Sequence, residues 1–184
     1  MRYREGIGVA AFALLYLGAA HAAGDGSAAQ EAFFANLHEL CGQSFAGATE
    51  FPEDPDDPMV GKKLIMSVQS CSEDEIRIPF RVGEDTSRTW LLTLADGRLL
   101  FKHDHRHPDG TPDEITMYGG RATADGTPDR QSFPADADTV ELIPEAATNV
   151  WTLEIDSDSR QFTYYLERHD KPRYKAVFDL SAPA

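Results

Sequence analysis

The spacing of hydrophobic residues changes along this chain from a helical period to a period of two. Phe33, Leu37, Leu40 and Cys41 recur at spacings of three to four, which predicts one helix over about residues 29–41. Beyond this helix, apolar and polar side chains alternate along most segments. Alternation of this kind is typical of β-strands with one buried face.

The alternating segments are short and are separated by turn residues. We expect strands over residues 63–71, 75–82, 89–94, 99–107, 114–121, 139–143, 150–155, 161–168 and 173–180, with a further strand directly after the helix. Ala95-Asp96-Gly97-Arg98 contains the Asp-Gly pair that tight hairpins favour. The predicted fold is therefore all-β, an antiparallel up-and-down meander of about nine or ten strands. We expect it to close into a barrel, because closure removes exposed edges; a two-sheet sandwich is the alternative.

The first residues have the order of a secretory signal peptide. Arg2 and Arg4 precede an apolar run over residues 7–20, and Ala20-His21-Ala22 offers a small-residue cleavage site. We predict a signal peptide over residues 1–22 and a single barrel domain over residues 23–184. The apolar run is shorter than the roughly 20 residues of a membrane span, and no later segment is long enough either. These features predict a periplasmic or secreted protein without a membrane span.

The chain contains two cysteines, Cys41 and Cys71. An even number of cysteines in an exported chain predicts a disulfide. The alternative is a redox pair or a thiolate nucleophile, but the two residues lack the C-x-x-C spacing of redox motifs.

Acidic residues outnumber basic ones 31 to 17, for a formal net charge of −14. Residues 1–22 hold two basic and one acidic residue, so the remaining chain is one unit more negative. Such a surface repels nucleic-acid phosphates and anionic lipids, which excludes both as partners. Recognition of a protein partner through the acidic surface stays open.

Candidate chemistry is concentrated in the strand expected over residues 99–107. His103, His105 and His107 stand at alternate positions and share a strand face with Leu99 and Phe101. If the apolar residues face the barrel interior, His103 and His105 do so as well, close to the barrel mouth. The other face carries charged residues that we expect in solvent: Lys102, Asp104 and Arg106.

A two-residue turn at Asp109-Gly110 would set the partners of these histidines. Phe101 would then lie opposite Tyr118, His103 opposite Thr116, and His105 opposite Glu114. A slip of one residue would put Asp113 in the place of Glu114.

Four interpretations of this cluster compete. It is a structural hydrogen-bond network, or a ligand-binding site, or a metal site, or an acid–base pair of His and Glu. The metal site would use His103 and His105, completed by Glu114 or His107. No nucleophile or oxyanion donor can be identified beside the histidines, so no catalytic residue is assigned and a cofactor stays unknown. The ligand-binding site would contain these residues: Trp90, Phe101, His103, His105, Glu114 and Tyr118.

Two resemblances bear on function. The segment Gly42-Gln43-Ser44-Phe45-Ala46-Gly47 after a helix is similar in layout to the calycin superfamily, with Phe45 where lipocalins have a tryptophan. Residues 102–110, with Tyr118-Gly119-Gly120, resemble an uncharacterised family of exported bacterial proteins, a resemblance that spans most of the mature chain. The calycin layout implies a barrel with an internal cavity for a small ligand, and neither resemblance implies an activity.

The leading hypothesis is therefore an exported, non-catalytic protein that binds a small apolar ligand in a barrel cavity. One alternative is a metal-binding protein or metal-dependent enzyme that uses His103 and His105. The other is an envelope protein-interaction module without an internal site.

Overall fold

Ten strands form one antiparallel sheet in the order β6-β5-β4-β3-β2-β1-β10-β9-β8-β7. The structure is a computed structural model that describes residue 1 and residues 25–184, so the predicted signal peptide lies, apart from residue 1, outside the described residues. The strands are β1 (Ser44–Phe51), β2 (Leu64–Ser67), β3 (Glu75–Val82), β4 (Asp85–Ala95), β5 (Arg98–His105), β6 (Tyr118–Arg121), β7 (Arg130–Pro134), β8 (Asn149–Asp156), β9 (Gln161–Arg168) and β10 (Lys171–Pro183).

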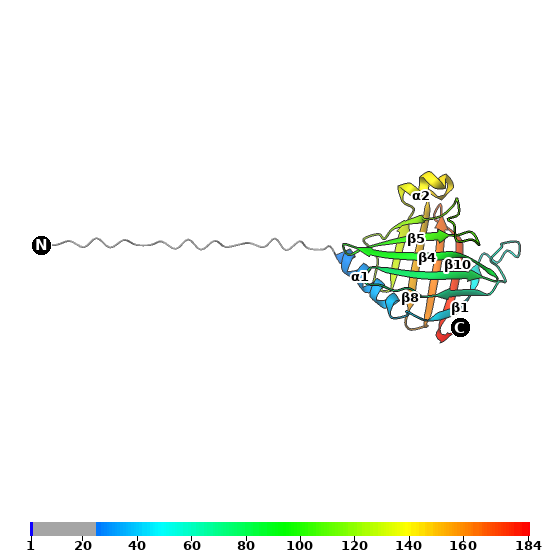
Figure 1. The fold of residues 1–184 in the computed structure, drawn as a ribbon, viewed down its shortest axis with the longest axis horizontal. Coiled ribbons are helices and arrows are strands. Elements are labelled where there is room, and N and C mark those ends of the chain that lie inside the picture. The colour runs from blue at the N-terminus through cyan, green and yellow to red at the C-terminus, as the bar shows by residue number, and fades with distance from the viewer. Residues whose placement is uncertain (2–24) are drawn as a thin grey trace.

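The sheet curls into a nearly closed barrel, which confirms the predicted meander (Figure 1). Its two edge strands, β6 and β7, meet at a seam without forming a regular ladder. The Asp136 N–H donates to the Gly119 carbonyl at 3.0 Å, and the Thr123 N–H donates to the Ser132 carbonyl at 2.9 Å. A Cβ at Gly120 would overlap the Pro134 carbonyl oxygen, so the seam closes because this position has no side chain.

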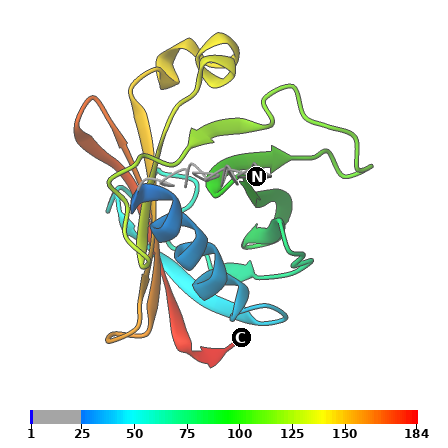
Figure 2. The ribbon, with the colours of Figure 1, turned by 90° about the vertical axis from the view of Figure 1, so that its left-hand side faces the viewer.

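One end of the barrel is covered by α1 (Asp25–His38), which lies across the opening (Figure 2). Phe33 and Leu37 are fully buried in the core. Gln30 joins the helix to the sheet: its amide donates to the Thr123 carbonyl at 3.0 Å, and its side-chain oxygen accepts from the Leu99 N–H at 2.8 Å. The helix begins and ends a few residues earlier than the predicted range 29–41.

The predicted disulfide is present at this same end of the barrel. Cys41 follows α1 and Cys71 follows β2, and their Cα atoms are 6.3 Å apart. Since the strands alternate in direction, the connections β1–β2, β3–β4, β5–β6, β7–β8 and β9–β10 all lie at the other end.

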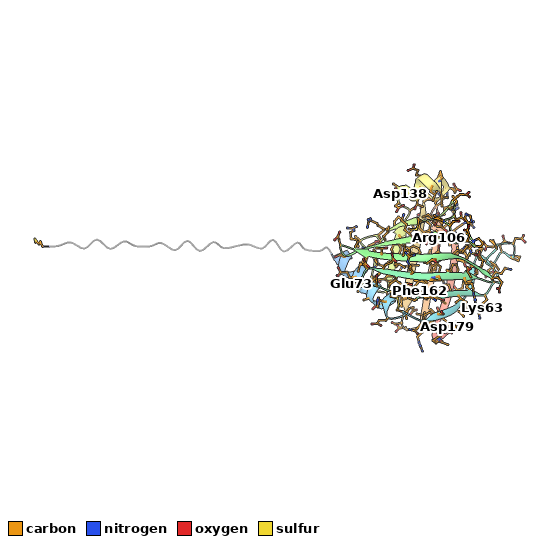
Figure 3. The ribbon with its side chains drawn as sticks, viewed as in Figure 1. Lys63, Glu73, Arg106, Asp138, Phe162 and Asp179 are labelled. Atoms are coloured by element: carbon orange, nitrogen blue, oxygen red, sulfur yellow. A yellow bond between two sulfur atoms is a disulfide. The ribbon has the colours of Figure 1, made fainter. Side chains whose placement is uncertain are left out.

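Large aromatic side chains fill the barrel between its two ends. Phe162, labelled in Figure 3, is fully buried, and it contacts the rings of Trp90 and Phe178. The predicted alternation therefore holds at the start of β9. Phe162 and Tyr164 are buried in the core, Gln161 is exposed, and Thr163 between the two aromatic residues is only partly buried.

Two element predictions are wrong. Residues 139–143 were expected as a strand, but residues 139–142 lie in α2 (Ala137–Leu142) and Ile143 is its C-cap. The helix begins here because the Asp136 carboxylate caps it by accepting the Thr139 N–H at 3.0 Å. Strand β7 was not predicted. Only Gln131 and Phe133 are buried in it, so its hydrophobic pattern contains a single large apolar residue.

The expectation that Lys102 and Asp104 are solvent-exposed is also wrong. They point away from the barrel interior but are only 8% and 5% exposed. The Lys102 Nζ lies 2.6 Å from an Asp136 carboxylate oxygen at the start of α2. Asp104 accepts from the Arg106 Nε at 2.8 Å. The segment after β5 and the start of α2 thus cover the outer face of this strand.

Candidate ligand-binding site

A cavity of about 250 Å³ opens at the barrel end that α1 does not cover. Three stacked rings form its floor: Phe80 and Trp90 have centroids 4.5 Å apart, and Trp90 and Tyr164 have centroids 4.7 Å apart. We call it the mouth cavity, defined by the floor residues Phe80, Trp90 and Tyr164 and the rim residues Arg88, His105, Arg168 and Arg173.

His103 lines the mouth cavity but has no ring nitrogen left for a ligand. Its Nδ1 lies 3.1 Å from the Tyr118 carbonyl oxygen, which can only accept, so Nδ1 carries the proton. Nε2 then accepts the Tyr164 hydroxyl at 2.9 Å. Burial lowers the pKa of His103 to about 3, so the ring is neutral at physiological pH. This arrangement matches the structural interpretation of His103.

His105 lies two residues after His103 on the same face of β5, closer to solvent, and is half-buried. Its Nε2 is 3.1 Å from the Tyr118 hydroxyl. Burial, and then the nearby Arg88 guanidinium, lower the pKa of His105. Burial also raises the pKa of Tyr118 to about 12, so the phenol stays neutral. The histidine and the phenol therefore form a neutral hydrogen-bonding pair at the rim.

The predicted pairing of β5 with β6 is wrong by two residues. His103 lies opposite Tyr118, rather than Thr116, and Phe101 lies opposite Gly120. The turn is longer than the predicted two residues, because the chain between β5 and β6 contains an irregular loop over residues 106–117. A shift of two residues preserves the face of every side chain, which explains why Tyr118 still lies beside the histidines.

The predicted site residues are only partly brought together. Trp90, His103, His105 and Tyr118 line the mouth cavity. Phe101 does not, because it is fully buried in the core beside Phe133.

Glu114 is exposed in the loop and is not among the lining residues. The carboxylate near His105 is Asp113, whose N–H donates to the His105 carbonyl at 3.0 Å. Asp113 and His105 together line a recess that continues the mouth cavity toward η1 (Pro144–Ala146).

Three arginines that sequence reasoning missed reach the cavity. Arg88 precedes Trp90 by two positions on β4, Arg168 ends the inward face of β9, and Arg173 lies at the start of β10. For Arg88 and Arg168 the alternation was a usable signal: each shares a face with buried aromatic residues. Arg173 stands next to a register irregularity between Pro172 and Tyr174, where alternation gives no guide.

The hydrogen bonds around His103 do not favour the metal interpretation. The Tyr164 hydroxyl occupies the one lone pair that a neutral His103 could offer a metal. In the part of the chain that the structure describes, no three His, Cys, Asp or Glu side chains are grouped as metal ligands. His107 lies on the exposed loop that follows β5.

Comparisons with protein-family models, curated proteins and solved structures find no significant match. Within residues 25–184, no helix is both long enough and apolar enough to cross a membrane.

Proposed function

We propose that this protein is a non-catalytic binding protein that holds one small organic molecule in the mouth cavity. The observation that carries the proposal is the combination of an aromatic floor with a polar rim in one concave site. Ligand sites are typically built in this way, with apolar walls that supply affinity and a few polar groups that fix orientation. The His103 network supports this role by holding Tyr118 and Tyr164 in place.

The size of the cavity supports a small ligand. Its volume of about 250 Å³ lies just below the roughly 300–1,000 Å³ of sites for drug-sized molecules. Phe162 and Phe178 fill the barrel beneath the floor, so a long chain cannot extend inward. The mouth cavity is therefore shallower than the deep apolar cavity that a lipocalin-like layout implies.

We further propose that the protein acts outside the cytoplasm. The Cys41–Cys71 disulfide is typical of proteins that fold in an oxidising compartment. Export to the periplasm or the medium agrees with this environment and with the leader expected over residues 1–22.

The binding test uses a cavity-filling variant. Leu166 lines the mouth cavity and is partly buried, so Leu166→Trp should fill it. We expect saturation-transfer NMR to detect binding of indole, benzyl alcohol or benzoate to the wild type and to lose that signal in Leu166→Trp.

Val177→Trp is the matched control. Val177 lies between the buried Ala176 and Phe178 on β10 and therefore faces the outside of the barrel. Binding should persist in this variant. Equal binding to wild type and Leu166→Trp, or no binding of any of the three compounds to the wild type, would contradict the proposed function.

A further inference from the structure

The charge of the mouth cavity opposes that of the molecule. The chain has a formal net charge of −14, yet Arg88, Arg168 and Arg173 line the cavity together with one carboxylate, Asp57. Cationic side chains that gather in a concave site of an acidic protein focus a positive potential there. A local excess of this kind points to an anionic ligand.

Among the described residues, two of the three guanidinium groups form no ion pair with a carboxylate. Arg88 pairs with Asp85, where hydrogen bonds from Ser87 and Arg88 outweigh burial and lower the pKa of Asp85 to about 2. Arg168 donates from Nε to the neutral Asn149 side-chain oxygen at 2.7 Å, which orients its guanidinium without cancelling its charge.

The Arg173 side chain forms no hydrogen bond or ion pair within the described residues, and it is exposed at the rim. Asp57 offsets one of these two free charges. One of its carboxylate oxygens already accepts the Met59 N–H at 2.9 Å. The mouth cavity itself, without the adjoining recess that Asp113 lines, is left with an excess of one positive charge.

The other polar groups of the cavity add no charge. His103 is neutral, and the Tyr164 hydroxyl donates to it. Burial raises the pKa of Tyr174 to about 12, and its hydroxyl lies 3.0 Å from the Thr49 hydroxyl. The phenols therefore stay protonated and add no negative charge to the cavity.

We propose that the ligand is a small monoanionic carboxylate with an aromatic or short aliphatic body. Its body would lie on Trp90 and Tyr164, and its carboxylate would face Arg168 and Arg173. The planar guanidinium matches the two oxygens of a carboxylate, and one excess charge balances a monoanion. This inference rests on the proposed binding function, and it adds the chemical class of the ligand.

The test compares benzoate with benzyl alcohol, which has the same ring but no charge, and with phenyl phosphate, a dianion at neutral pH. Calorimetric titrations would use the wild type, Arg168→Gln and Arg173→Gln. We expect benzoate to bind at least about tenfold more tightly than benzyl alcohol, since each charge-assisted hydrogen bond contributes about a factor of ten. Either substitution should lower benzoate affinity about tenfold and leave benzyl alcohol affinity nearly unchanged.

Arg98→Gln is the control, because it removes the same charge from an exposed position at the α1 end of the barrel. It should not change benzoate binding. If Arg168→Gln fails to fold, the affinity of Arg173→Gln for benzoate tests the proposal, because Arg173 is exposed and its substitution should not affect folding.

Equal binding of benzoate and benzyl alcohol would overturn the carboxylate proposal and leave the proposed function standing. Tighter binding of phenyl phosphate than of benzoate would also overturn it, in favour of a dianion. Failure of benzoate, benzyl alcohol and phenyl phosphate to bind the wild type would overturn the carboxylate proposal, and failure of indole as well would overturn the proposed function.

Discussion

The histidine row contains three residues with three different environments. His103 is 3% exposed and hydrogen-bonded at both ring nitrogens, His105 is half-buried at the rim, and His107 is exposed on a loop. Alternation correctly predicted that His103 and His105 share the face of Phe101. It could not predict that Tyr164, 61 residues away, occupies the Nε2 of His103. The partner of a buried polar group depends on which strand closes over it.

The buried His103 should make the stability of the protein depend on pH. Burial lowers its pKa to about 3 in the folded state, against 6.5 for a free side chain. The unfolded chain therefore takes up a proton between these values that the folded chain does not. The free energy of unfolding should fall as the pH drops from 6.5, by about 3 kcal/mol at pH 4 from this residue alone.

Urea unfolding of the wild type and His103→Phe at pH 7 and pH 4 measures this contribution. His103→Phe should be less stable at pH 7, because the Tyr164 hydroxyl and the Tyr118 carbonyl lose their partner. Its loss of stability between the two pH values should be about 3 kcal/mol smaller than in the wild type. His107→Phe should behave as the wild type, and an identical pH dependence in all three proteins would contradict the assignment.

Short elements at the seam decide how the barrel closes. Strand β6 has only four residues, and two of them, Gly119 and Gly120, leave room for neighbouring backbone. Gly119 has a φ of +152°, and Thr139 of α2 accepts its N–H at 2.7 Å and donates to its carbonyl at 2.8 Å. At Gly119, the helix α2 thus provides the hydrogen bonds that a neighbouring strand would otherwise provide.

Gly120→Ala should weaken this seam. The added methyl would overlap the Pro134 backbone, so we expect a loss of about 3 kcal/mol in the free energy of unfolding. Hydrogen exchange at the Asp136 N–H should accelerate, because its acceptor is the adjacent Gly119 carbonyl.

The matched control is Gly110→Ala. Its Cβ would meet open space, and the cost should be limited to about 1 kcal/mol for the left-handed backbone at φ +84°. Similar losses in the two variants, with unchanged exchange at Asp136, would mean that Gly120 does not close the seam.

The two ends of the whole molecule differ in construction. One end is covered by α1, and the disulfide joins the segment directly after this helix to the β2–β3 connection. The other carries the mouth cavity among its loops. This asymmetry places the rigid closure at one end and the proposed binding site at the other.

The disulfide should stabilise the whole fold. It closes a loop of 30 residues in the unfolded chain, which contributes about 3–4 kcal/mol in the chain-entropy model. Reduction should lower the urea midpoint accordingly, and the double variant Cys41→Ala/Cys71→Ala should match the reduced wild type. Reductant should not affect the double variant. An unchanged midpoint after complete reduction would contradict this prediction.

The sequence by itself determined the local features of this protein. Alternation predicted most strands and their inward faces, and the presence of only two cysteines predicted the disulfide. These features follow from a two-residue period or from the residue inventory, and neither requires knowledge of strand partners. Trp90, His103, His105 and Tyr118 were predicted as lining residues for this reason.

Only the tertiary structure decided what the lining residues form together. Arg88, Arg168 and Arg173 lie up to 85 positions apart and meet because β4, β9 and β10 bend around one opening. Loop length sets the register of β5 on β6, and the clearance at Gly120 lets the seam close. Convergence of distant side chains depends on how the sheet closes, and a local two-residue pattern contains no information about closure.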